Sequence, residues 1–175
     1  MLHCNGLMNG LMWTLCWCAW PFAGALAAGT PAVHGTHANT AAGIAADITE
    51  ISFEQDCSGC PSSATLVLRR DGLAAFTLQG KARLGGASRQ ERGRIGPQDF
   101  AALARFIVVQ GYFELQDEYQ DTSLQDGNWA VTRVVRGGRE KRVFRREDAG
   151  PQTLMAVESA IAEVKARIRM TPDVP

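Results

Sequence analysis

No Asp, Glu, Lys or Arg precedes Asp47 in this 175-residue chain, and all 18 basic and 18 acidic residues lie from that position onward. The uncharged start contains a bulky apolar run over residues 11–22, followed by small residues that include an Ala-Leu-Ala sequence. An apolar run closed by an Ala-x-Ala sequence is typical of a secretory signal peptide. We therefore expect residues 1–27 to be an export signal that is cut between Ala27 and Ala28.

A leader that stays attached is the alternative. A membrane-spanning helix needs about 20 apolar residues. Residues 10–28 nearly reach that length, but Pro21 interrupts them. The leader also lacks the basic residues that usually begin a signal peptide. Two locations stay open: a periplasmic or secreted protein with no stable membrane span after cleavage, and an inner-membrane protein anchored by its uncleaved leader.

The rest of the chain divides into three parts. Residues 28–46 are rich in Gly, Ala and Thr without apolar periodicity, which indicates a flexible spacer. Residues 47–170 have the size of a single domain, and residues 171–175 form a short tail with two prolines. The formal net charge is zero. Nucleic acid is therefore not expected as a partner, because phosphate binding favours an excess of positive charge.

Alternating apolar residues and turn signals predict the strands. Asp71-Gly72 and Gly137-Gly138 each separate two such segments, as in β-hairpins. A polar segment after the first hairpin suggests a further, edge-like strand. The predicted strands cover residues 48–54, 64–70, 73–79, 88–95, 129–136 and 139–145.

Two helices complete the predicted fold. Pro97 and Pro151 mark their starts, because proline suits the first turn of a helix. Apolar residues then recur at helical spacing. These are Phe100, Leu103, Phe106 and Ile107 in the first helix, and Leu154, Val157, Ile161, Val164 and Ile168 in the second. We expect a two-layer α+β domain, with an antiparallel sheet of about five to six strands in the order ββββ-α-ββ-α and both helices on one face.

Cleavage would leave two of the five cysteines, Cys57 and Cys60. An oxidising compartment allows them to pair. A structural disulfide is one interpretation, and a redox pair in which Cys57 attacks and Cys60 resolves is the other. Redox cysteines are usually activated at a helix N-terminus. This pair leads into a predicted strand, which favours the structural role.

The loop before the second hairpin is acidic and flanked by aromatic residues. Asp117, Asp121 and Asp126, with Tyr119 and Trp129, are candidates for a ligand groove. A carboxylate-based hydrolase would require the three aspartates to converge in one pocket. The spacing does not match a calcium-binding loop. No metal or other cofactor is expected, since the predicted domain has two cysteines and no histidine, and a structural zinc site needs four ligands.

These features together resemble a known family. A strand ends in a loop with the sequence Cys-Ser-Gly-Cys-Pro over residues 57–61, an Asp-Gly hairpin follows, and an amphipathic helix closes the domain. Over residues 48–168 the chain is similar to an uncharacterised family of bacterial secreted domains of unknown function, whose usual loop reads Cys-x-Gly-x-Cys-Pro-x-Tyr. Asp126 stands where the family carries an Asp. The loop here is one residue shorter, and Ser63 replaces the aromatic residue.

The resemblance implies an exported domain without implying an activity. We expect a non-enzymatic binding or structural module of the bacterial envelope, whose partner is an envelope protein or a small ligand. The alternative is a thiol–disulfide redox protein that uses Cys57 and Cys60.

Overall fold

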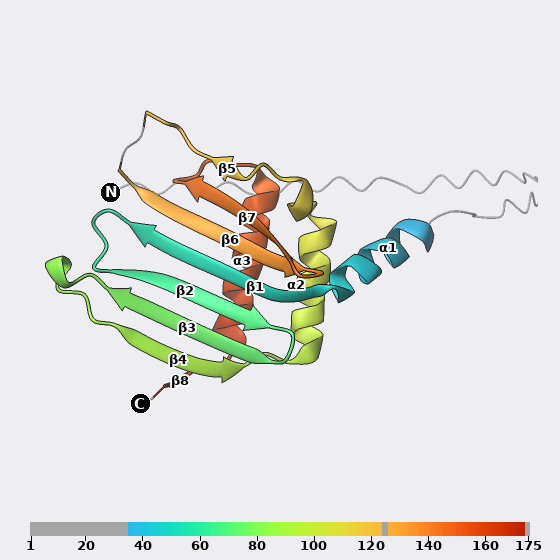
Figure 1. Ribbon diagram of the computed structural model, residues 1–175, viewed down its shortest axis with the longest axis horizontal. Coiled ribbons are helices and arrows are strands. Elements are labelled where there is room, and N and C mark those ends of the chain that lie inside the picture. The colour runs from blue at the N-terminus through green and yellow to red at the C-terminus, as the bar shows by residue number, and fades with distance from the viewer. Residues whose placement is uncertain (1–34, 124–125, 174–175) are drawn as a thin grey trace, which may run out of the picture. The chain divides into compact units, whose positions relative to one another are not determined.

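One sheet and three helices make up the computed structural model, which describes residues 35–123 and 126–173 (Figure 1). The strands are β1 (Ile48–Cys57), β2 (Ser62–Arg69), β3 (Leu73–Gly80), β4 (Arg89–Arg94), β5 (Glu118–Tyr119), β6 (Asn128–Arg136), β7 (Arg139–Arg146) and β8 (Thr171–Pro172). The helices are α1 (Gly35–Ala46), α2 (Pro97–Val109) and α3 (Gln152–Arg167), with short 3₁₀ turns η1 (Ala82–Leu84) and η2 (Tyr112–Glu114). The predicted α+β class is confirmed.

The strand order across the sheet is β5-β7-β6-β1-β2-β3-β4-β8. All neighbours are antiparallel except β5 and β7, which run parallel, so the sheet is mixed. The prediction of five to six antiparallel strands missed β5 and β8. Each contains two residues, too few to show alternation in the sequence.

Both predicted hairpins are present. Gly72 has φ of 91° in the turn between β2 and β3, and Gly137 and Gly138 have φ of 54° and 76° between β6 and β7. These values lie in the region that glycine enters at little cost. The polar segment after the first hairpin is β4, and it pairs with β3 on one side and with β8 on the other.

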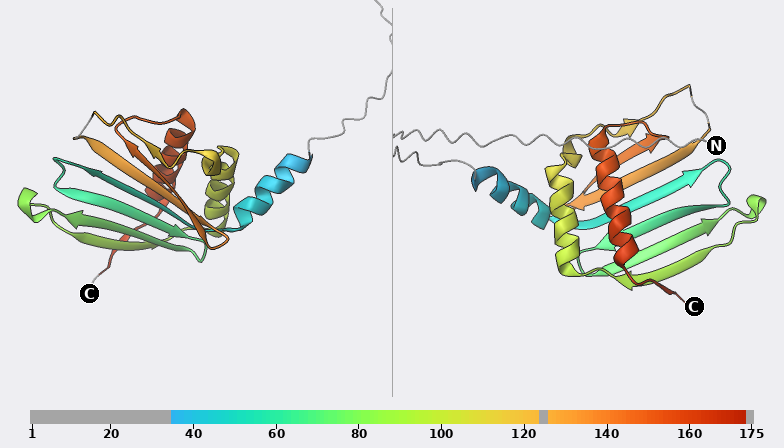
Figure 2. Two further views of the ribbon diagram at one scale, coloured as in Figure 1. Left: turned by 45° about the horizontal axis from the view of Figure 1, so that its top comes forward. Right: turned by 180° about the vertical axis from the view of Figure 1, so that it is seen from behind.

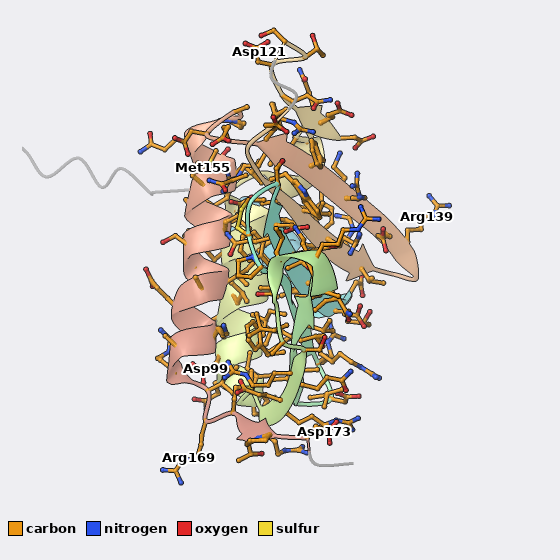
Figure 3. The ribbon with its side chains drawn as sticks, turned by 90° about the vertical axis from the view of Figure 1, so that its left-hand side faces the viewer. Asp99, Asp121, Arg139, Met155, Arg169 and Asp173 are labelled. Carbon is orange, nitrogen blue, oxygen red and sulfur yellow. A yellow bond between two sulfur atoms is a disulfide. The ribbon has the colours of Figure 1, made fainter. Side chains whose placement is uncertain are left out.

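Helices α2 and α3 lie across the same face of the sheet (Figure 2). Their apolar stripes are buried at Leu103, Ile107, Leu154 and Ile161, with 0–3% of each residue exposed. In Figure 3 the label Met155 marks α3. The side chains on the sheet face opposite the helices point away from this helix. The predicted two-layer arrangement of α2 and α3 on one side of the sheet is therefore present.

Helix α1 occupies part of the segment predicted to be a spacer. Residues 35–46 are helical, and Ala45 is buried in the main core. Alanine has the highest helix propensity, which explains a helix without an apolar stripe. The predicted signal peptide, its cleavage site and residues 28–34 lie outside the described residues. None of the helices in the described part of the chain is long and apolar enough to cross a membrane.

Candidate functional site

A cleft lies on the helix-facing side of the sheet, at the strand ends that extend beyond the core. Phe53 of β1 and its cross-strand neighbours Leu66, Phe76, Thr132 and Val143 form the last core row. Side chains alternate between faces along a strand, so the next row on this face lies two residues further along each strand. That row consists of Leu78, Ala64, Gln55, Ala130 and Arg145, in order across β3, β2, β1, β6 and β7.

This row forms the floor of the cleft. Two alanines stand beside the longer side chains of Gln55 and Arg145, which leaves space between them. The volume is about 400 Å³, within the usual range of small-molecule sites. The lining residues are Gln55, Asp56, Cys60, Ser62, Ala64, Leu78, Asn128, Trp129, Ala130, Arg145, Glu147 and Asp148.

The disulfide lies at the rim of this cleft. Cys57 and Cys60 are joined, and the Cys60 N–H donates to the Cys57 carbonyl at 3.3 Å. The Lys81 ammonium lies 2.5 Å from the Asp56 carboxylate and donates to the Cys57 carbonyl at 2.7 Å. The same Asp56 carboxylate accepts the Cys57 N–H at 2.7 Å. The loop is therefore fixed to the end of β3 by a charge-assisted network.

On the side of the cleft opposite the disulfide, Arg145 and Glu158 form a buried ion pair. Arg145 Nε donates to the Glu158 carboxylate of α3 at 2.7 Å, and their side chains are 14% and 6% exposed. The Thr132 hydroxyl lies 3.4 Å from the other carboxylate oxygen, and Arg145 Nη1 donates to the Glu147 carbonyl. Burial raises the pKa of Glu158 above its ordinary value, while Arg145 opposes that rise. The pair fixes the Arg145 guanidinium at the cleft wall.

The positive and negative charges of the side chains that line the cleft do not cancel. Arg145 is paired with Glu158, and Asp56 is paired with Lys81. Glu147 accepts the Asn128 N–H at 2.7 Å. Within the described residues, neither Glu147 nor Asp148 has a salt-bridge partner. The cleft therefore carries an excess of negative charge.

The predicted acidic groove is not assembled in one place. Asp117 pairs with Lys141 at 2.5 Å. Asp121 lies at the end of its loop (Figure 3), where hydrogen bonds from the Ser123 hydroxyl and N–H lower the pKa of this exposed carboxyl. Asp126 is exposed. None of the three aspartates lines the cleft.

The two predicted aromatic residues have different contacts. The Tyr119 hydroxyl accepts the Gln116 N–H at 3.0 Å, and Tyr119 packs against the core. Trp129 lines the cleft, but its ring centroid is 6.2 Å from that of Phe144, whose position in β7 faces away from the helices. In the described ranges, no group of three or more His, Cys, Asp or Glu side chains could hold a metal ion.

The sequence does not predict most of the residues that line the cleft. Cys60 and Trp129 were candidates, but Gln55, Arg145 and Glu147 were not. One signal was available: Glu158 falls among Leu154, Val157 and Ile161 on the apolar stripe of α3, where a charge needs a buried partner.

In comparison with known proteins, no protein-family model matches the chain, and the search of curated proteins found no match to it.

Proposed function

We propose that this protein is an exported, non-enzymatic binding module of the bacterial envelope that holds a small polar ligand in the cleft beside Cys60. The observation that carries the proposal is a cleft of about 400 Å³ whose floor is a continuous cross-strand row. The resemblance to a family of secreted domains supports export but gives no ligand.

The cleft has the features of a preformed site. Ion pairs fix the polar groups of Arg145 and Asp56 before any ligand arrives. Such preorganisation lowers the entropic cost of binding. Gln55, Ser62 and Asn128 add neutral donors and acceptors to the lining, and a few polar groups of this kind give small-molecule sites their specificity.

Filling the cleft tests this proposal. Ala64 lies on the floor, and Ala75 lies on the opposite face of the neighbouring strand. We expect NMR titration of labelled protein with amino acids, amines and sugars to shift the amide signals of Gln55 and Asn128. The variant Ala64→Met should abolish these shifts, whereas the matched control Ala75→Met should keep them. Binding that Ala64→Met leaves unchanged, or no binding by any of these compounds, would refute the proposal.

Export is part of the proposal and has its own test. Expression of the full chain in a bacterium, followed by fractionation and intact mass, reports the location and the first residue together. We expect a periplasmic or secreted protein that begins at Ala28. A full-length chain in the membrane fraction would instead support the anchored alternative.

A redox role is the second candidate, and the position of Cys60 at the cleft favours it. A redox titration that follows thiol labelling separates the two functions. Structural disulfides have midpoints below about −300 mV, whereas disulfide oxidoreductases lie between about −270 and −120 mV. We expect the lower value, because the loop follows a strand end and not a helix N-terminus.

A further inference from the structure

The two sulfur-bearing residues of the disulfide have different surroundings. Cys60 lines the cleft, and Cys57 does not. Cys57 is the last residue of β1 and stands opposite Asn128 of β6. Cys60 follows it in the loop, outside the sheet. Cys60 is therefore the member of the disulfide that contributes to the lining of the cleft.

The backbone of Cys57 is also held more firmly. Its N–H donates to Asp56, and its carbonyl accepts both the Lys81 ammonium and the Cys60 N–H. The Lys81 ammonium lies at the Cys57 carbonyl, and the Asp56 carboxylate lies beside it. A nearby cation stabilises a thiolate, and a more stable thiolate is a better leaving group in thiol–disulfide exchange.

We propose that Cys60 is a site of modification by small thiols that enter the cleft. The thiolate of the small molecule attacks Sγ of Cys60, and a new sulfur–sulfur bond forms there as the Cys57–Cys60 bond breaks. Cys57, whose carbonyl accepts the Lys81 ammonium, leaves with the electron pair as a thiolate and then takes a proton from water. The roles expected from the sequence are thus reversed, since Cys60 carries the adduct and Cys57 is released.

The charge of the cleft selects among thiols. Glu147 and Asp148 lack ion-pair partners within the part of the chain that the structure describes, so they attract a cationic thiol and repel an anionic one. In a water-like dielectric, one carboxylate about 3–6 Å from a bound cation raises the local concentration of that cation by about threefold to tenfold. The order of reactivity should be cysteamine, then 2-mercaptoethanol, then 2-mercaptoethanesulfonate, after correction for their rates with a model disulfide.

This proposal does not depend on the binding function, because it concerns which sulfur reacts. A protein that binds none of the tested compounds can still be modified at Cys60, and a protein that binds them can react elsewhere. Either proposal can therefore be refuted by its own experiment while the other one stands.

The test uses the mature, oxidised protein with a large excess of each of the three thiols, because a midpoint below about −300 mV makes the adduct a transient species. Samples are quenched at early times with N-ethylmaleimide, and fragment ions that separate Cys57 from Cys60 locate the adduct and the maleimide. We expect the adduct on Cys60 and the maleimide on Cys57. An adduct mainly on Cys57, an equal mixture, or no adduct under conditions that open an unfolded Cys-Ser-Gly-Cys peptide disulfide would overturn the proposal.

Two pairs of variants test the electrostatic part. Lys81→Met leaves Asp56 beside the departing thiolate, so the exchange should slow about threefold to tenfold, whereas Asp56→Asn should accelerate it. The double variant Glu147→Gln/Asp148→Asn should remove the preference for cysteamine, and the new side-chain amide oxygen at position 147 can still accept the Asn128 N–H. Circular dichroism confirms that each variant is folded. Rates that do not respond to Lys81, or a preference that survives the double variant, would contradict this part.

Discussion

A single residue, Arg145, balances Glu158, the glutamate of α3 that is buried against the sheet. The Glu158 side chain is 6% exposed and its carboxylate lies 2.7 Å from the guanidinium. We expect Arg145→Met to lower the free energy of unfolding by about 3–5 kcal/mol near neutral pH, because it leaves a buried charge without a partner. Urea denaturation measures the loss. The control is Arg145→Met/Glu158→Met, which replaces both charges by apolar groups and should recover most of the stability.

The same variant should respond to pH in a defined direction. Burial raises the pKa of Glu158 above its ordinary value of 4.5, and Arg145 lowers it again. Without Arg145 the folded-state pKa rises further, while the unfolded-state value stays the same. Stability should then be greatest below the unfolded value and fall as pH rises through the folded one. The penalty of Arg145→Met should therefore be larger at about pH 8 than at about pH 5, and an equal penalty at both would contradict this account.

Individual residues also mark the limits of sequence reasoning. Ile48 breaks the alternation of the first strand, yet it is fully buried, because a register shift between Ile48 and Glu50 turns it into the core. A bulge of this kind depends on the neighbouring strand, so the local pattern does not reveal it. The cleft was missed for the same reason: Gln55 and Arg145 lie in one cross-strand row, on either side of Ala130, only through the register of β1, β6 and β7.

At the scale of elements, the loop between β3 and β4 is packed against the disulfide loop. A Cβ atom on Gly86 would lie 1.7 Å from the carbonyl oxygen of Pro61, whereas a Cβ atom on Gly59 would meet nothing within 4 Å. That oxygen also accepts the Lys81 N–H at 2.8 Å, so it cannot move freely. We expect Gly86→Ala to cost about 1–3 kcal/mol or more through overpacking.

Gly59→Ala is the matched control, because it adds the same methyl group to the disulfide loop itself. Its effect should stay within about 0.5 kcal/mol. The midpoint of urea unfolding compares the two variants. Equal stabilities would mean that the two loops are not in contact in solution.

Elements with strong local signals were the ones that the sequence predicted. The two hairpins have Asp-Gly and Gly-Gly turns, and α2 and α3 have apolar stripes and a proline at their starts. β5 and β8 exist only through pairing with β7 and β4. Their residues are ordinary loop and tail sequences, so nothing local distinguishes them. The acidic loop was singled out by composition, but composition does not place its aspartates, and each has a separate environment.

At the scale of the whole molecule, the sheet with α2 and α3 should unfold as one unit to which α1 adds little. Among the residues of α1 whose burial is described, Ala45 alone is buried. The Arg70 guanidinium donates to the carbonyls of Ala45 and Ala46. Burial of one methyl group and a hydrogen bond to a charged group contribute together about 1–3 kcal/mol.

We therefore expect a chain that begins at Asp47 to fold, with a free energy of unfolding lower by about 1–3 kcal/mol and a nearly unchanged urea m-value. The comparison is Ile161→Ala in a chain that keeps α1, which removes a fully buried side chain of α3 and should cost about 2–5 kcal/mol. If the shortened chain loses more stability than Ile161→Ala, α1 belongs to the cooperative core. In that case the domain begins before Asp47, and the segment ahead of it is a structural element of the domain.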